Sequence, residues 1–256
     1  MTTSKVPIMT HTFLTTPRHY RIATHQSPGE GTGVLFCPGY RSSMDSTKAT
    51  ALAEWCAQHN VPLTRFDYHA HGNSEGDFKE FTIGNAMADA LDIIDHTGAD
   101  NLILIGSSMG AWIALNAALE RKAVVRGLIG VASAPDFTER LMFTRMTPEQ
   151  RREMQENGLI WAHSDFTDSD YPITQHFIEE ARHHLLLDDI IGLDIPIQLF
   201  HGQADVDVPW EMSLELAEKL MGEEVALTLI KDGDHRLNRP ADLALMTDAL
   251  ARMVGK

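Results

Sequence analysis

Between Asn101 and Arg121 the chain reads NLILIGSSMGAWIALNAALER, and this stretch restricts the possible folds more than any other. An apolar run of strand length precedes the five residues GSSMG at 106–110, and an Ala/Leu-rich segment of helical character follows them. A G-x-S-x-G between a strand and a helix predicts a sharp turn that lifts the hydroxyl of its central residue, Ser108, clear of the backbone. Glycines flank the serine because side chains there would collide with the closely approaching strand and helix. The alternative is an ordinary turn in which the serine only caps a helix.

Around this stretch, short apolar runs alternate with patterns typical of amphipathic helices. The apolar runs of strand length are Val34–Cys37, Val61–Phe66, Val124–Ala132, Pro196–Phe200 and Val225–Ile230. Such alternation predicts an α/β fold, with a mostly parallel central sheet flanked by helices. A chain of 256 residues is long enough for one such domain.

The alternation breaks between residues 136 and 194, a connection longer than neighbouring strands need. Helical patterns occur there near Thr138–Met146, Pro148–Asn157 and Ile173–Leu187. We interpret 136–194 as a helical cap or lid insertion, and residues 1–135 and 195–256 as the core domain. A peripheral helical layer without a role at the site is the alternative.

Composition excludes several classes of partner. The formal net charge is −15, whereas nucleic acids and anionic membranes need a basic face. The sequence shows no apolar stretch long enough to span a membrane, and its first residues lack the apolar core of a secretory signal. The two cysteines, Cys37 and Cys56, lie in apolar patterns that favour small buried side chains. We therefore predict a cytoplasmic location, whereas the oligomeric state stays unknown.

A serine hydroxyl is a poor nucleophile at neutral pH unless a base takes its proton and a carboxylate orients that base. Two loops after predicted strands offer such groups: HGQADVDVP at 201–209 and KDGDHR at 231–236. Open α/β sheets place their sites at the carboxyl ends of the strands, where both loops lie.

With GSSMG, HGQADVDVP and GDH, and with the loops CPGY and FDYHAHGNS, the chain resembles the α/β-hydrolase superfamily along nearly its whole length. The resemblance implies an α/β-hydrolase fold in which Ser108 is the nucleophile, Asp205 the acid and His235 the base. The backbone N–H groups of Met109 and Tyr40 would form the oxyanion hole. The stretches PGYRSSMDSTKA and HGQADVDVPW are further similar to palmitoyl-protein thioesterases, which implies hydrolysis of acyl esters or thioesters.

Several neighbouring residues compete for these roles. Asp207 is a rival acid, although the HG-x-x-D spacing favours Asp205. His201 is interpreted as a structural residue at a strand end, and Asp232 and Asp234 as loop residues near the base. His69 and His71 could line the site, but a solvated or loop-bracing role is favoured. His183 and His184 lack a third ligand at suitable spacing, so no metal site is expected there.

The sequence therefore predicts a serine hydrolase that cleaves acyl esters or thioesters through an acyl-enzyme, on a small-molecule or acylated substrate, without cofactor or metal. Phe143 and Trp161 are the first choices for an acyl pocket in the insertion, with Phe166 a further apolar candidate. A serine peptidase, and a catalytically silent binding protein on the same fold, are the alternatives.

Overall fold

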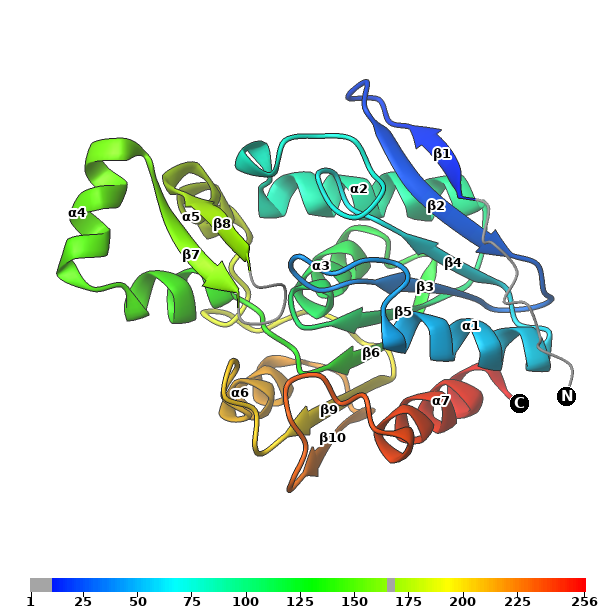
Figure 1. Cartoon of the computed structure of the whole chain (residues 1–256). Helices are drawn as coiled ribbons and strands as arrows, with labels where there is room; N and C mark the ends of the chain where they lie inside the picture. Colours follow the sequence, from blue (N-terminus) through cyan, green and yellow to red (C-terminus); the bar gives the residue numbers. More distant parts are fainter. Residues whose placement is uncertain (1–10, 165–168) are drawn as a thin grey trace, which may run out of the picture.

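A computed structural model gives the structure of residues 11–164 and 169–256. Strands and helices alternate through most of the chain (Figure 1). The strands are β1 (Thr12–Thr15), β2 (Arg21–Ser27), β3 (Gly33–Cys37), β4 (Leu63–Phe66), β5 (Leu102–Ser107), β6 (Val125–Val131), β7 (Leu159–Ser164), β8 (Ser169–Thr174), β9 (Ile197–Gly202) and β10 (Val225–Ile230). The α-helices are α1 (Thr47–His59), α2 (Ile83–Thr97), α3 (Met109–Glu120), α4 (Pro148–Asn157), α5 (Gln175–Ala181), α6 (Glu211–Lys219) and α7 (Pro240–Val254). Three short helical segments complete the elements: η1 (Phe78–Glu80), η2 (Thr138–Phe143) and η3 (Arg182–His184).

The main sheet has the strand order β1-β2-β4-β3-β5-β6-β9-β10 in the described part of the chain. β1 pairs with β2, and β2 with β4, in antiparallel fashion, whereas every pair from β4 to β10 is parallel. The predicted α/β fold with a mostly parallel sheet is confirmed. Because the parallel strands run the same way, the loops after β3, β5, β9 and β10 emerge at the same edge of the sheet.

Side chains alternate between the two faces of the sheet, and each face buries its own apolar core. Leu35 and Leu104 point toward the core beneath α2 and α3, whereas Phe36 and Ile105 point toward the core beneath α1 and α7. Figure 1 shows α1 and α7 on one side of the sheet and α2 and α3 on the other. With apolar residues on both faces, the central strands read as continuous hydrophobic runs.

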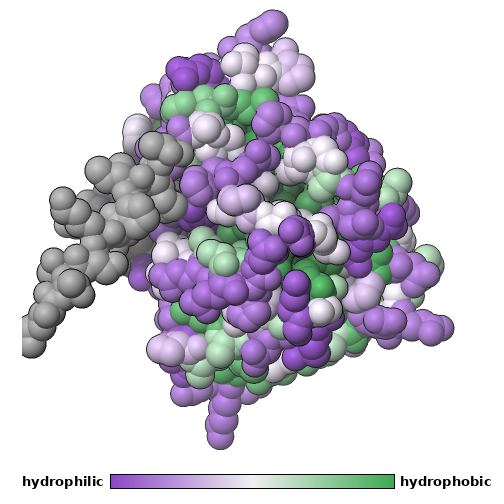
Figure 2. Space-filling view, turned by 90° about the vertical axis from the view of Figure 1, so that its right-hand side faces the viewer, coloured by the Kyte–Doolittle hydropathy of each residue, from purple (hydrophilic) through white to green (hydrophobic). Residues whose placement is uncertain are grey.

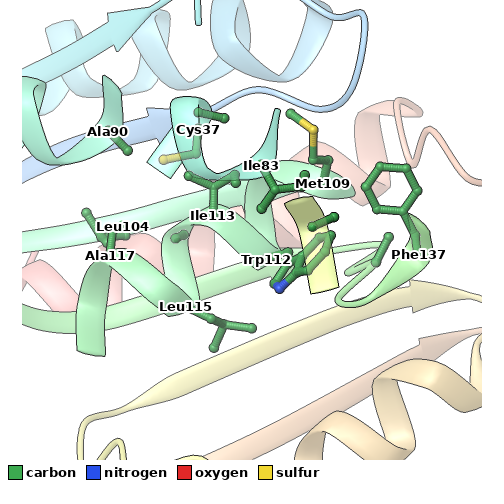
Figure 3. Close-up of a cluster of buried hydrophobic side chains, with 14 of the residues drawn as sticks. Cys37, Ile83, Ala90, Leu104, Met109, Trp112, Ile113, Leu115, Ala117 and Phe137 are labelled. Carbon is green, nitrogen blue, oxygen red and sulfur yellow. The ribbon is translucent and has the colours of Figure 1, made fainter. Parts of the chain in front are cut away.

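Helix α3 lies at the centre of the molecule, and every residue from Met109 to Ala118 is buried. Figure 3 shows Met109, Trp112, Ile113 and Leu115 of this helix spread over its different sides, and the ring of Phe137 contacts that of Trp112 edge-on. A helix that is apolar all round needs partners all round, which sheet and neighbouring helices supply. The start of α3 is thereby fixed from several directions.

The insertion between β6 and β9 is not wholly helical. It contains the π-helix η2 and the helix α4, followed by an antiparallel hairpin of β7 and β8, then α5 and η3. The helical pattern predicted for Ile173–Leu187 is helical only from Gln175 to His184. Figure 1 shows α4, β7 and β8 extending beyond the sheet on the side away from the chain termini.

The surface away from the insertion is mostly hydrophilic (Figure 2). Figure 2 shows the face opposite the insertion, where hydrophilic side chains predominate with small hydrophobic areas between them. Among the residues with described structure, no helix is both long enough and apolar enough to cross a membrane.

Candidate active site

Ser108 occupies the sharp turn between β5 and α3, as the G-x-S-x-G context predicted. Its backbone φ of 55° lies in the left-handed region, which strains a residue with a side chain. A Cβ on Gly106 would collide with Ala111, and one on Gly110 would collide with the carbonyl oxygen of Cys37. The two glycines therefore let the strand, the turn and the helix approach closely enough to hold Ser108 in this conformation.

Asp205 follows β9, and its buried carboxylate is fully occupied by hydrogen bonds. Oδ1 accepts from the backbone N–H groups of Asp207 and Val208, both at 2.9 Å. Oδ2 accepts from His235 Nδ1 at 2.7 Å and from His201 Nε2 at 3.1 Å. These four bonds fix the carboxylate in position and orientation.

The hydrogen bonds also keep Asp205 ionised. Burial by itself raises the pKa of a carboxyl group, because it disfavours the charged form. The hydrogen bonds from His201 and His235, together with the charge of His235, outweigh burial and hold the pKa of Asp205 well below its ordinary value. Asp205 is therefore an anion across the neutral range.

His235 lies in the loop after β10 and connects the other two residues. Because Nδ1 faces the Asp205 anion, it carries the proton and donates, which leaves the Nε2 lone pair to accept from the Ser108 hydroxyl at 3.1 Å. Asp234 steadies the loop, since its Oδ1 accepts the backbone N–H groups of Arg236 and Leu237. Ser108, His235 and Asp205 thus form one hydrogen-bonded chain, drawn from three separate loops.

The proposed oxyanion donors are the backbone N–H groups of Met109 and Tyr40. Met109 is the first residue of α3, where backbone N–H groups have no partner within the helix. Tyr40 belongs to the loop after β3, and this loop packs against the turn at Ser108: a Cβ on Gly39 would lie 3.1 Å from the carbonyl oxygen of Ser107. Tyr40 and Ser108 line the same cavity.

The other histidines contact different groups. His201 is buried, and its Nδ1 accepts a hydrogen bond from Ser213 Oγ at 2.6 Å. Its Nε2 donates to Asp205, so His201 connects α6 to Asp205. His69 and His71 are buried in the loop after β4. His184 bonds Glu180 at 2.7 Å on α5 and η3.

One group of side chains in the described residues has the proximity that a metal site needs. Ligand atoms of Asp205, Asp207 and His235 lie within 4.8 Å of one another. The Asp205 oxygens already accept four protein hydrogen bonds, and His235 uses its two nitrogens for Asp205 and Ser108. A metal ion would therefore have to displace these bonds.

A cavity of about 440 Å³ lies between Ser108 and the insertion. Ser108 and His235 form part of its wall, and η2, α4 and the β7–β8 hairpin supply most of the rest. The apolar lining residues are Phe137, Leu141, Met142, Met146, Ile160, Ala162, Ile173 and Val208. A second cavity of about 310 Å³ shares Tyr40, Ser108 and His235 and extends toward the start of α1.

Phe143 and Trp161 are not among the residues that line either of these cavities. The Phe143 ring lies beneath the guanidinium groups of Arg151 and Arg182. Trp161 is 54% exposed and contacts Lys79. Phe166 lies outside the described residues. Of the lining residues, Met142 and Ile160 directly precede the predicted Phe143 and Trp161, and Leu141 lies two residues before Phe143.

Comparison with known proteins establishes the family. The model of the alpha/beta hydrolase family matches residues 34–245, and the chain belongs to this family. The palmitoyl-protein thioesterase ABHD10 of Homo sapiens, described as mitochondrial, is 36% identical over 245 residues, which cover 95% of this chain and 80% of the human protein. The Bos taurus ABHD10 is 35% identical over the same shares.

Solved structures agree with this assignment. A structure from Agrobacterium vitis S4 has a TM-score of 0.92 at 34% identity, covering 96% of this chain and 98% of its own. Mouse alpha/beta hydrolase domain-containing protein 10 has a TM-score of 0.88 at 33% identity, with the same coverage. The family and these relatives are consistent with hydrolysis of an acyl ester or thioester bond.

The comparisons overturn one prediction. The ABHD10 relatives are described as mitochondrial, which points to a mitochondrial rather than a cytoplasmic location. The predicted cytoplasmic location was therefore wrong. It rested on composition and cysteine usage, and neither property distinguishes one reducing compartment from another.

The depressed pKa of Asp205 predicts a pH dependence of stability. A carboxyl whose folded pKa lies below its unfolded value of about 3.9 stabilises the fold above that value, and this contribution is lost as the pH falls. Asp205→Asn lacks the titrating group. We expect the difference in unfolding free energy between wild type and Asp205→Asn to be greatest between pH 5 and 7 and to shrink toward pH 3, as measured by urea denaturation.

Asp207→Asn serves as the control, because it keeps the Asp205 carboxylate and the backbone N–H of residue 207. Its stability should follow the wild-type pH dependence. A difference between wild type and Asp205→Asn that stays constant from pH 7 to pH 3 would contradict the assignment of Asp205 as a tightly held anion.

Proposed function

We propose that this protein is a serine hydrolase that cleaves acyl esters or thioesters through an acyl-enzyme on Ser108. The observation that carries the proposal is the hydrogen-bonded order Ser108–His235–Asp205 at the carboxyl edge of the sheet. A catalytically silent binding protein has no need for three such side chains in this order. The thioesterase activity in the names of the ABHD10 relatives supports the choice of bond.

In this proposal each residue has a step. Ser108 Oγ attacks the acyl carbon, and its proton passes to Nε2 of His235. The ion pair with Asp205 stabilises the imidazolium, while the N–H groups of Tyr40 and Met109 stabilise the carbonyl oxygen as it becomes negative. When the C–O or C–S bond breaks, His235 returns the proton to the leaving alcohol or thiol. Water then attacks the acyl-enzyme with His235 as base, and the carboxylic acid and free Ser108 are produced.

The two cavities fit the two sides of such a substrate. An ester or thioester has an acyl arm and a leaving-group arm, which both extend from the carbonyl carbon. The cavity beneath the insertion is lined largely by apolar side chains and suits the acyl arm, with each buried methylene contributing about 0.8 kcal/mol. The second cavity is lined in part by Arg41, Lys48 and Asn238, so it suits a more polar leaving group. In this proposal, residues 136–194 act as a cap that forms the acyl site.

The nucleophile can be tested with a fluorophosphonate probe. We expect the probe to label Ser108, and Ser108→Ala to abolish both labelling and ester hydrolysis, since loss of a triad nucleophile lowers kcat by on the order of 10⁶. Ser107→Ala is the matched control, because Ser107 directly precedes Ser108 at the end of β5 and its hydroxyl is not part of the Ser108–His235–Asp205 hydrogen-bonded chain. Intact-protein mass spectrometry and peptide mapping give the readout. Persistent labelling of Ser108→Ala would refute the proposal.

The acyl cavity makes a prediction about chain length. Leu141 lines the cavity on η2, so Leu141→Trp should shorten it and move the maximum of kcat/KM toward shorter acyl chains. Phe143→Trp introduces the same tryptophan two residues away, outside the cavity lining, and should leave the maximum in place. A series of p-nitrophenyl esters of graded length measures both. If Phe143→Trp shifts the maximum and Leu141→Trp does not, the acyl chain binds elsewhere.

A further inference from the structure

The loop after β3, which carries Tyr40, adopts a conformation that needs external support. Arg41 has a φ of 57°, in the left-handed region where a residue with a side chain is disfavoured. The loop closes with a turn in which the Ser42 N–H donates to the Gly39 carbonyl at 3.0 Å. Such strain persists only when surrounding contacts hold the backbone in place.

Those contacts come from the loop after β4. The backbone N–H of Arg41 donates to Nε2 of His71 at 3.0 Å. Three residues further along, the backbone N–H of Met44 donates to Asp67 Oδ1 at 2.7 Å. His71 therefore fixes the peptide that directly follows Tyr40, whereas Asp67 fixes the far end of the loop.

The surroundings of His71 fix its tautomer. Its Nδ1 lies 3.1 Å from the carbonyl oxygen of His69, so Nδ1 carries the proton and donates there. Nε2 is left with a lone pair directed at Arg41. The ring is only 4% exposed. Aromatic rings surround it, with centroids between 4.6 and 6.2 Å away: Tyr40, Tyr68, Phe78 and Phe81.

This environment keeps the ring neutral. Burial, together with the nearby charges of His69 and Arg41, lowers the pKa of His71 to about 4, against the opposite effect of the hydrogen bond to the His69 carbonyl. A protonated ring would turn Nε2 into a donor facing another donor. The neutral ring instead provides the acceptor that the Arg41 N–H requires.

We propose that His71 is a positioning residue for the oxyanion hole: its neutral Nε2 holds the Tyr40–Arg41 peptide so that the Tyr40 N–H points at the developing oxyanion. This inference rests on the proposed function and adds to it a residue that touches neither the substrate nor the triad. His69, two residues earlier in the same loop, is also buried, but its backbone hydrogen bonds join it to Asp89 and His71 rather than to the Tyr40 loop. The two histidines therefore form a matched pair for mutation.

The test compares three variants of His71 and distinguishes a loss of orientation of the Tyr40 N–H from a loss of stability of the fold. In His71→Leu the acceptor is lost. His71→Asn can place its amide near the Nδ1 position only, whereas His71→Gln can reach the Nε2 position and accept from Arg41. We expect kcat for a short-chain ester to fall about 10- to 100-fold in His71→Leu and His71→Asn, because a misdirected oxyanion donor loses transition-state stabilisation. His71→Gln should recover activity to within a few-fold of wild type, and His69→Leu should retain it.

A trifluoromethyl ketone inhibitor provides a readout that a purely structural role would not change. It forms a tetrahedral oxyanion on Ser108, whereas the product fatty acid does not. Its affinity should fall in His71→Leu and His71→Asn by the same factor as kcat, while the inhibition constant of the fatty acid stays within about threefold. Should His71→Leu fail to fold, the Asn and Gln variants decide the question.

Two outcomes would overturn the inference. In the first, the His71 variants lower the melting temperature but leave kcat and ketone affinity unchanged. In the second, ketone and fatty acid affinities fall together, which would indicate general damage to the site. Failure of the proposed function is distinguishable from either, because Ser108→Ala would then keep its activity whatever the His71 variants do.

Discussion

The strained turn at Ser108 is the constraint on which the rest of the site depends. A positive φ at a serine is unfavourable, and it is maintained because β5, β3 and α3 approach so closely that positions 106 and 110 have no room for a side chain. The burial of α3 on all sides anchors the helical end of the turn. Packing of the apolar core thereby maintains the strained turn that presents the Ser108 hydroxyl at the edge of the sheet.

The other groups near Ser108, namely Asp205, His235 and the peptide beside Tyr40, are each held by hydrogen bonds to a further residue as well as by their own loops. His201 and two backbone N–H groups fix Asp205, Asp205 fixes the tautomer of His235, and His71 fixes the peptide beside Tyr40. Each support comes from a different segment of the chain. A parallel sheet makes this possible, because it gathers loops that are distant in sequence at one edge.

The sequence predicted those features that local chemistry determines. GSSMG between a strand and a helix, and HG-x-x-D after a strand, have steric and chemical requirements that can be read without a structure. It did not predict the β7–β8 hairpin, whose strands include Pro172 and alternate only weakly in polarity. Phe143 was the first choice for the pocket, whereas Leu141 lines the cavity. The helical pattern near Thr138–Met146 does not reveal that η2 is a π-helix, in which different side chains share a face. The His71–Arg41 bond joins residues 30 positions apart, and no local pattern indicates it.

The central claim is that Asp205 orients His235 to take the proton of Ser108. A comparison of kcat between Asp205→Asn and Asp207→Asn tests this claim most directly. An asparagine at 205 cannot accept from the His235 Nδ1–H as the carboxylate does, so the imidazole loses its required tautomer. We predict that kcat for a p-nitrophenyl ester falls by roughly 10⁴ in Asp205→Asn and by less than about tenfold in Asp207→Asn, with both proteins folded. A reversal of these two effects, or an Asp205→Asn variant within tenfold of wild type, would contradict the account.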